Sequence, residues 1–126
     1  MMRNILLAAG LLALSVNAFA GCQTSNMAGN WQTFIAEPEL GWSSCKILFG
    51  TTGIAKSGSC RDNASSNARV TGGQLKLTTG CQVTGSIYIA GTRNKLEAGR
   101  LSADRNIVTG IVTIEGSSTL FTAVRY

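Results

Sequence analysis

Few side chains in this sequence could carry out acid–base or nucleophilic catalysis. The 126 residues include no histidine and only six Asp and Glu residues. A serine or threonine nucleophile usually needs a neighbouring base, and no motif in the chain supplies one. The sole close carboxylate pair is Glu37-Pro38-Glu39, and two carboxylates on one loop do not flank a cleft as the pair of a glycosidase must. We therefore expect that this protein is not an enzyme.

Metal ions and cofactors are not predicted either. Calcium usually takes six or more oxygen ligands, and Asp62-Asn63 offers too few. The four cysteines form no C-x-x-C pair and no histidine accompanies them, so the sequence lacks the usual zinc ligand sets. We expect no bound metal and no cofactor.

The N-terminal residues predict export. Arg3 precedes an apolar run over residues 5–16, and Ala18-Phe19-Ala20 supplies the small residues that signal peptidases require. This pattern predicts a signal peptide over residues 1–20, cleaved after Ala20. The apolar run is about twelve residues long, too short for a membrane-spanning helix, which needs ~20. Residues 21–126 are then expected to form one domain, in the periplasm or outside the cell.

Four cysteines remain after cleavage, and they are Cys22, Cys45, Cys60 and Cys81. An even number of cysteines in an exported chain predicts two disulfides. The alternative is a lipoprotein anchored at Cys22, because Phe19-Ala20-Gly21-Cys22 loosely matches a bacterial lipobox. A lipid on Cys22 would leave one cysteine without a disulfide partner.

The region after residue 20 has the pattern of antiparallel strands. Short stretches of alternating apolar and polar residues recur between glycine-rich or polar turns, without helical periodicity. Eight short strands with brief connections favour an all-β, up-and-down antiparallel barrel, with a two-sheet β-sandwich as the alternative. The expected strands are Trp31–Ala36, Cys45–Phe49, Ile54–Arg61, Gln74–Thr78, Gln82–Ile89, Leu96–Leu101, Ile107–Glu115 and Leu120–Arg125.

The apolar positions predict a filled barrel interior. Residues 83–89 and 108–114 both place valine, glycine and isoleucine at alternate positions, so one face of each strand is apolar. Gly85 and Gly110 within these faces would allow the strands to curve. A barrel of eight strands is just wide enough for side chains to fill it. The side chains expected to face inward are Phe49, Leu75, Leu77, Ile87, Ile89, Val112 and Ile114.

An up-and-down barrel collects its connections at two ends. We name the end where the first strand begins the starting end, and the opposite one the open end. Alternating strand directions place Cys22 and Cys81 at the starting end and Cys45 and Cys60 at the open end, which predicts the disulfides Cys22–Cys81 and Cys45–Cys60. Strict alternation would put Cys45 and Cys60 on opposite faces, so we expect a β-bulge at Ser57-Gly58-Ser59.

The open end is expected to carry the binding surface, because the sequence pattern gives it the longer connections. Long loops on a rigid barrel usually carry function. Trp42 lies in the first of these loops, 37–44, where it could anchor a partner or cover the barrel mouth. The polar residues expected to rim the same end are Arg61, Asp62, Asn63, Arg69, Arg93, Asn94 and Lys95.

Gly29-Asn30-Trp31 opens the first strand and Arg125 closes the last, which places both at the starting end. The pattern resembles the G-x-W motif and late arginine of the calycin superfamily, which includes lipocalins and avidins, and of bacterial metalloprotease inhibitors with similar barrels. The resemblance implies that Trp31 plugs the starting end and that Arg125 lies across it in a cation–π contact, a structural role. Those inhibitors insert a free N-terminal segment into their target, whereas a disulfide at Cys22 would leave only Gly21 ahead of it.

These patterns predict an exported, non-enzymatic protein that binds a protein or small ligand in the envelope or outside the cell. The net charge of +5 falls to +4 when Arg3 is cleaved off. The basic residues are scattered rather than gathered in a stripe, so nucleic acid is not an expected partner. The alternatives are an inhibitor of a secreted protease and a small-ligand carrier. A carrier would need an interior void of several hundred cubic ångströms.

Overall fold

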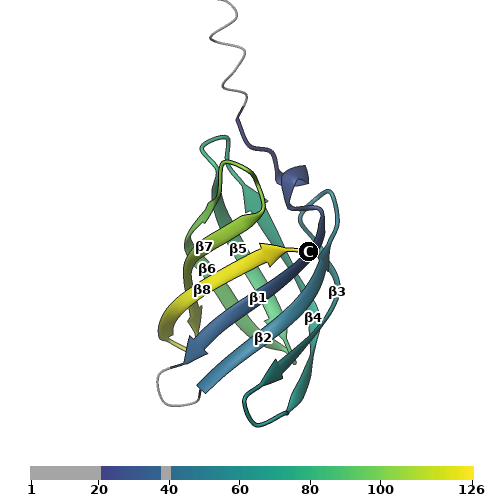
Figure 1. The fold of residues 1–126 in the computed structure, drawn as a ribbon, viewed down its shortest axis with the longest axis vertical. Coiled ribbons are helices and arrows are strands. Elements are labelled where there is room, and N and C mark those ends of the chain that lie inside the picture. The colour runs from purple at the N-terminus through teal and green to yellow at the C-terminus, as the bar shows by residue number, and fades with distance from the viewer. Residues whose placement is uncertain (1–20, 38–40) are drawn as a thin grey trace, which may run out of the picture.

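The chain forms a closed barrel of eight antiparallel strands in a computed structural model that describes residues 21–37 and 41–126 (Figure 1). Each strand pairs with its neighbours in the sequence, and β8 pairs with β1 to close the barrel. The elements are η1 (Thr24–Met27), β1 (Gly29–Glu37), β2 (Gly41–Phe49), β3 (Ala55–Asp62), β4 (Asn67–Leu77), β5 (Gln82–Ile89), β6 (Thr92–Leu101), β7 (Ile107–Ile114) and β8 (Ser117–Arg125). The predicted up-and-down barrel is confirmed, and the two-sheet sandwich is wrong. The predicted signal peptide lies outside the described residues.

All eight predicted strands are present, but several extend further toward the open end than the pattern indicated. β2 begins at Gly41 rather than Cys45, β4 at Asn67 rather than Gln74, and β6 at Thr92 rather than Leu96. The added segments are polar or glycine-rich and lack a clear apolar alternation. Their backbone groups still pair with the neighbouring strands, because ladder hydrogen bonds do not require a particular side chain.

The longer strands overturn the predicted difference between the two ends. The described connections are 63–66, 90–91 and 115–116 at the open end, and 50–54, 78–81 and 102–106 at the starting end. None of these open-end connections is longer than the shortest one at the starting end. The remaining open-end connection, 38–40, lies outside the described residues. Loop length therefore gives no reason to place a binding surface at the open end.

The barrel interior is filled, as predicted. Exposed and inward positions alternate along the strands, and the inward side chains form one core cluster. The voids left between them measure about 20 and 10 Å³. A small-molecule pocket usually measures roughly 300 Å³ or more, so the interior offers no calyx for a ligand. Of the side chains predicted to face inward, Phe49, Leu75, Leu77, Ile87 and Val112 are buried, and Ile89 and Ile114 are partly buried against them.

The glycines predicted to allow curvature lie at irregularities of the pairing. The register of β5 with β6 shifts between Val83 and Gly85, and that of β6 with β7 shifts opposite Gly110. A Cβ atom on Gly110 would lie only 2.8 Å from the Cα of Gly99 on β6. The two backbones approach this closely because neither residue has a side chain.

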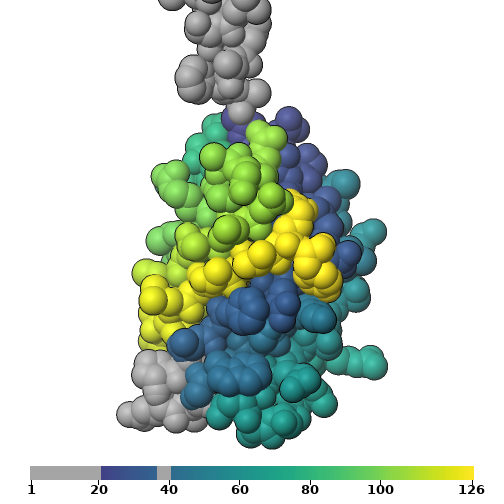
Figure 2. Space-filling model, in the orientation of Figure 1, coloured from purple at the N-terminus to yellow at the C-terminus, as the bar shows by residue number. Residues whose placement is uncertain are grey.

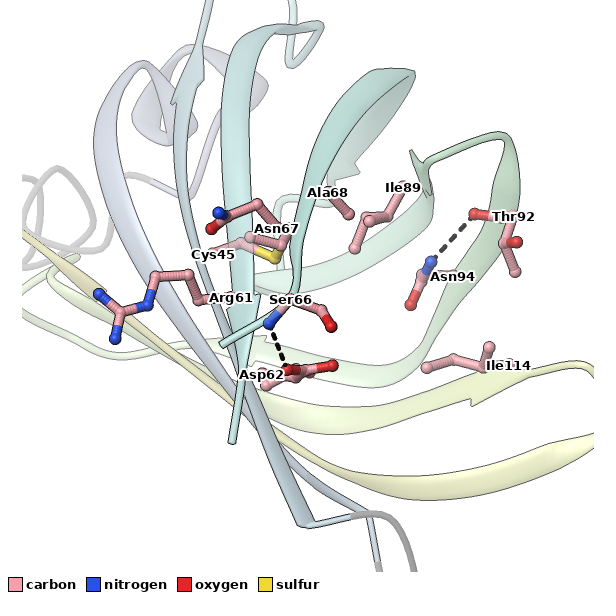
Figure 3. Close-up of a pocket in the computed structure, with 12 residues that line it drawn as sticks. Cys45, Arg61, Asp62, Ser66, Asn67, Ala68, Ile89, Thr92, Asn94 and Ile114 are labelled. Carbon is pink, nitrogen blue, oxygen red and sulfur yellow. Dashed lines mark hydrogen bonds between the residues drawn. A yellow bond between two sulfur atoms is a disulfide. The ribbon is translucent and has the colours of Figure 1, made fainter. Parts of the chain in front are cut away.

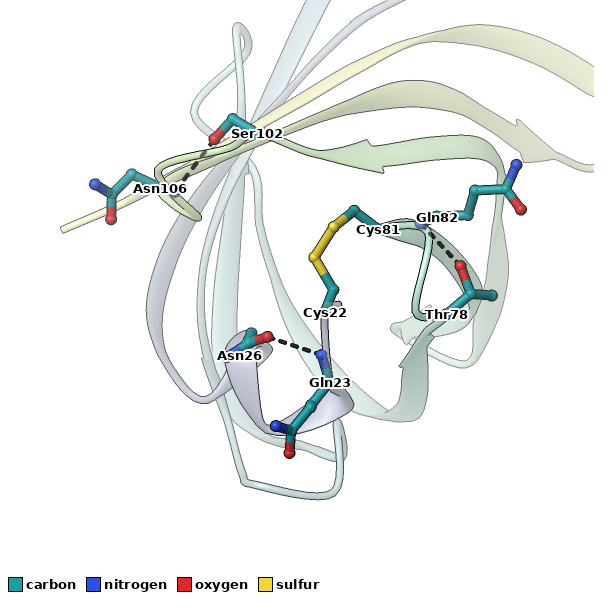
Figure 4. Close-up of a disulfide and its surroundings, with 8 residues drawn as sticks. All are labelled: Cys22, Gln23, Asn26, Thr78, Cys81, Gln82, Ser102 and Asn106. Atoms are coloured by element: carbon teal, nitrogen blue, oxygen red, sulfur yellow. Dashed lines mark hydrogen bonds between the residues drawn. A yellow bond between two sulfur atoms is a disulfide. The ribbon is translucent and has the colours of Figure 1, made fainter. Parts of the chain in front are cut away.

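The predicted disulfide Cys22–Cys81 is present at the starting end (Figure 4). It ties the segment before η1 to the turn between β4 and β5, where the Cys22 N–H also donates a hydrogen bond to the Thr79 carbonyl. The lipoprotein alternative requires a free sulfur on Cys22 to carry the lipid, but this sulfur is bonded to Cys81. Disulfides are typical of proteins in an oxidising environment.

The second predicted disulfide, Cys45–Cys60, joins residues directly opposite each other on β2 and β3. The β-bulge that brings both sulfurs to the inner face is present, but its predicted position is wrong. Leu48 pairs with Ser57 and Phe49 with Ala55, which leaves Lys56 without a partner on β2. The bulge thus lies just before the predicted Ser57-Gly58-Ser59. There the long Lys56 side chain points to solvent, while Ala55 faces the core.

Trp31 and Arg125 close the starting end, as the calycin resemblance implied. They are direct partners in the register of β1 with β8, and the guanidinium carbon lies 4.3 Å from the centroid of the indole ring. Trp31 is fully buried, and its indole N–H donates a 2.9 Å hydrogen bond to the Met27 carbonyl. Partial burial lowers the pKa of the Arg125 guanidinium, which stays cationic. Arg125 also donates to the carbonyls of Asn26, Ala28 and Arg105.

The glycine of the Gly29-Asn30-Trp31 motif is required by this arrangement. Gly29 has a φ of +119°, a region that residues with a side chain rarely adopt. A Cβ atom there would lie 2.9 Å from a guanidinium nitrogen of Arg125. The motif therefore combines a buried indole with a backbone position that leaves space for the arginine.

We expect Asp104→Asn to reduce stability at neutral pH but not in acid. Asp104 Oδ1 accepts a 2.6 Å hydrogen bond from the Ser102 hydroxyl and a 3.1 Å bond from the Asn106 N–H, and these bonds lower the pKa of Asp104. A carboxylate whose pKa is lower in the folded than in the unfolded state stabilises the fold above its unfolded pKa of ~3.9. This contribution is lost as the pH falls through the folded-state pKa. Urea unfolding of both proteins at about pH 7 and pH 2 measures it. A deficit of the same size at both pH values would contradict it.

Candidate binding surfaces

A cup of about 230 Å³ lies at the open end, inside the rim of the barrel (Figure 3). Ile89 and Ile114, which pack against the core, and the Cys45–Cys60 disulfide line its apolar part. The remaining residues of the cup are Ser43, Arg61, Asp62, Ser66, Asn67, Ala68, Thr92 and Asn94.

The polar groups of the cup mainly serve the barrel itself. Asp62 Oδ1 accepts hydrogen bonds of 2.9 Å from the backbone N–H groups of Ala64 and Ser66, which holds the β3–β4 turn in place. Asn94 is buried and donates a 3.0 Å bond to the Thr92 carbonyl. The Arg61 guanidinium extends away from the other lining side chains (Figure 3). The cup is also smaller than most small-molecule pockets, so it is a poor site for a ligand.

A second candidate surface lies on the outer wall of the barrel around Trp42. Trp42 is part of β2, and its predicted position in a loop is wrong. Its side chain is 49% exposed, and that of Phe34 on the neighbouring β1 is 46% exposed. Two hollows of about 440 and 420 Å³ meet at these two aromatic side chains.

The two hollows differ in chemistry. Besides the aromatics, the first is lined by Gln32, Ser44, Lys46, Ser59 and Arg61, which gives it two cations and, among the described side chains, no carboxylate. The second is lined by Ile35, Ala36, Ser43, Leu120 and Thr122, and Leu120 of β8 is 74% exposed. An apolar area and a cationic area thus share one aromatic border. We name the combination of Phe34, Trp42, Leu120, Lys46 and Arg61 the Trp42 surface.

Exposed apolar side chains are concentrated on the half of the wall that contains this surface. The four strands β7, β8, β1 and β2 lie side by side, and Figure 2 shows their outer face. Among the exposed large apolar side chains, β3–β6 contribute only Tyr88 of β5. Those on the four strands are Ile107, Ile111, Leu120, Val124, Phe34, Trp42 and Leu48.

Exposed charged side chains show the opposite distribution. Among the described side chains, β7, β8, β1 and β2 expose only Lys46. Those exposed on β3–β6 are Lys56, Arg61, Arg69, Lys76, Arg93, Lys95, Glu97 and Arg100. The outer wall therefore has an apolar half and a cationic half, and the Trp42 surface lies where the two halves meet on the β2–β3 side.

The structure brings together two of the predicted binding residues, Trp42 and Arg61, in the cationic hollow. Asn63 follows β3, and its backbone N–H donates a 3.1 Å hydrogen bond to the Trp42 carbonyl. Asp62 supports the same turn from inside the cup. Arg69 is exposed on β4, one strand further from Trp42 than Arg61 is.

Arg93 and Lys95 do not join this group, because β6 lies on the opposite side of the barrel from β2. The Arg93 Nε donates a 3.0 Å hydrogen bond to the Ser86 hydroxyl. Lys95 forms a 3.3 Å ion pair with Glu97. A hydrogen bond from Thr113 and then the contact with Lys95 lower the pKa of Glu97. These two cations are therefore engaged with partners on β5 and β6.

Sequence reasoning missed Phe34, Lys46 and Leu120. Alternation from the buried Trp31 would have placed Phe34 on the outside, because Thr33 and Ile35 share the inner face with Trp31. Leu120 carried no such signal. It precedes the inward Phe121 directly, and a pair of adjacent apolar residues does not reveal which of them faces the core.

Within the described residues, no helix has the length and apolar character to span a bilayer. In the same part of the chain, no group of three or more His, Cys, Asp or Glu side chains could hold a metal ion.

Comparison with known protein families gives no match, and comparison with curated proteins gives none either. Among solved structures, the chain is similar to a redesigned β-barrel, with a TM-score of 0.60 and 13% identity. The alignment covers 82% of this chain and 94% of the designed one. At this level of identity the similarity shows the barrel fold alone.

Proposed function

We propose that this chain is an exported, non-enzymatic binding protein whose contact surface is the Trp42 surface. The observation that carries the proposal is the half-exposed indole of Trp42, next to the exposed Phe34 and Leu120. Tryptophan is enriched among the residues that dominate binding energy, because it offers a large contact area with few rotatable bonds. A group of exposed apolar side chains bordered by polar ones is typical of an interaction site.

Export is supported by the signal-peptide pattern and by the two disulfides. We also propose a calycin-like relationship, supported by the Gly29-Asn30-Trp31 motif and by the stacking of Arg125 on Trp31. The partner would be found in the envelope or outside the cell.

The alternative functions have less support. A small-ligand carrier would need a cavity of several hundred cubic ångströms, whereas the voids within the core measure about 20 and 10 Å³ and the cup at the open end about 230 Å³. A protease inhibitor that inserts its N-terminal segment would need a free segment ahead of the barrel. After the proposed cleavage behind Ala20, only Gly21 would precede Cys22, which is tied to Cys81. An inhibitor that binds through the outer wall would be one form of the proposed function.

We expect Trp42→Ala to weaken binding at least tenfold and to spare the fold. Removing an anchoring tryptophan from an interface weakens binding by about 2 kcal/mol or more, which is about 30-fold. The melting temperature should fall by less than about 5 °C, because the side chain is half exposed and outside the core. Retention of material from a native envelope extract on the immobilised protein measures binding, and thermal unfolding measures stability.

Tyr88→Ala provides a matched control, because Tyr88 is an exposed aromatic residue on β5, away from the Trp42 surface. Tyr88→Ala should retain the same material as the wild type. Equal retention by both variants would contradict the proposed function. A large drop in the melting temperature of Trp42→Ala would show that the indole covers the core instead.

A further inference from the structure

We propose that the partner of the Trp42 surface is an anionic lipid bilayer, with the apolar half of the barrel wall lying on the membrane surface. The inference rests on the proposed function, since it names the partner of the same surface. Three features of the described residues support it, namely an apolar row across four strands, the border position of the aromatics, and the sign of the neighbouring charges.

The apolar row follows from the strand register. Ile111 of β7 is paired with Leu120 of β8, and Ala36 of β1 is paired with Trp42 of β2. Leu120, Ala36 and Trp42 line the same hollow, so the two pairs form one continuous row. On the apolar half, β7, β8, β1 and β2 are each paired with a strand on both sides, so this part of the wall offers no unpaired backbone edge to a protein strand. A partner must therefore contact side chains, and a fluid lipid layer can follow a convex wall without a matching concave surface.

The aromatic side chains occupy the position that a membrane interface favours. Trp42 and Phe34 line both hollows, with the apolar one on the β8 side and the cationic one on the β3 side. Indole has an apolar ring and a polar N–H, and tryptophan is enriched where hydrocarbon meets headgroups. In the proposed orientation Leu120 and Ile111 contact the acyl region, and Trp42 lies at the headgroup level.

The charges next to the aromatics point to an anionic surface. Lys46 and Arg61 line the cationic hollow, and Arg69 is exposed on β4 beyond them. None of the described carboxylates lines either hollow. Lipid phosphates would complement these cations, as in other basic, apolar surface-binding segments. A second copy of this chain would instead bring further cations to the same interface, which is unfavourable.

Vesicles provide the test. The protein purified after export is mixed with vesicles of phosphatidylcholine alone, or of an equimolar mixture of phosphatidylcholine and phosphatidylglycerol. We expect it to sediment with the mixed vesicles, and we expect high salt to release it. Tryptophan emission should shift to shorter wavelength on binding. Trp42→Ala should remove this shift, because Trp31 is already fully buried.

The variants separate the apolar and ionic contributions. Trp42→Ala and Leu120→Ala should each weaken binding to mixed vesicles about tenfold, because each removes an inserted side chain. The double variant Lys46→Gln/Arg61→Gln should weaken it about 30-fold. The matched controls are Tyr88→Ala for the exposed aromatics and Lys76→Gln for the charges. Each control should change binding less than about threefold, because Lys76 and Tyr88 lie on β4 and β5, which do not border the apolar half.

Several results would overturn the lipid inference. Equal binding to both kinds of vesicle, or equal losses in the control variants, would do so. A dimer that Leu120→Ala dissociates, without vesicle binding, would identify a second copy as the occupant. A further outcome is that the protein fails to bind vesicles while Trp42→Ala still fails to retain envelope proteins that Tyr88→Ala retains. That result would show that the partner is a protein, and the proposed function would stand. If neither assay distinguishes Trp42 from Tyr88, both proposals fail.

Discussion

Replacing Trp31 by alanine is expected to lower the free energy of unfolding by about 4 kcal/mol. The indole is fully buried at the starting end and fills the space between the inner walls. Its removal leaves a cavity, takes the hydrogen-bond donor away from the Met27 carbonyl, and removes the ring on which Arg125 stacks. Each of these losses is destabilising, and the cavity contributes most.

Urea unfolding monitored by circular dichroism measures this loss. Trp42→Ala is the matched control, because it makes the same substitution on the outer wall, and it should cost less than about 1 kcal/mol. A double-mutant cycle with Arg125→Ala would isolate the Trp31–Arg125 coupling, expected to be about 1 kcal/mol. Similar costs for the two tryptophans would show that Trp31 does not close the barrel.

Replacing both Cys22 and Cys81 by alanine is expected to cost about 4 kcal/mol as well. The two residues are 59 positions apart, so the disulfide removes much conformational freedom from the unfolded chain. It also holds the segment that carries η1 against β4, where Thr24 Oγ1 accepts a 3.2 Å hydrogen bond from the Leu77 N–H. Without the disulfide, we expect this segment to separate from the starting end before the barrel unfolds.

Hydrogen exchange and denaturant unfolding would measure the two effects. The Leu77 amide should exchange faster than the amides of β7, whose hydrogen-bonded neighbours are β6 and β8. Removing Cys45–Cys60 provides the comparison, because its 15-residue separation predicts a smaller entropic loss of about 3 kcal/mol. Unchanged stability of the Cys22/Cys81 variant under oxidising conditions would contradict the prediction.

The two tryptophans illustrate how one barrel wall serves both stability and recognition. Trp31 and Trp42 lie on neighbouring strands, but Trp31 faces the core, whereas Trp42 faces outward. The direction of each side chain is set by its position along its strand, because successive side chains point to opposite faces. Trp42 adds little to the core, and we interpret its exposure as a consequence of its role in binding.

The order of apolar residues along the chain was enough to predict the strand number, the barrel and the filled core. Alternation is a local property, and each strand buries one face wherever its partners lie. The disulfide pairing followed from strand direction alone, because four cysteines at two ends leave one arrangement. The bulge lies at Lys56, one residue before the predicted Ser57-Gly58-Ser59. The sequence could not place it more closely, because neighbouring positions in a polar stretch have nearly the same pattern.

The candidate surface could not be derived in the same way. Phe34, Trp42 and Lys46 lie on the paired strands β1 and β2, and Leu120 of β8 joins them only through the closure of the barrel between β8 and β1. Local patterning determined which residues enter the core, because burial of apolar side chains is specified strand by strand. Which outward side chains become neighbours was decided by register and closure, which join segments more than 80 residues apart.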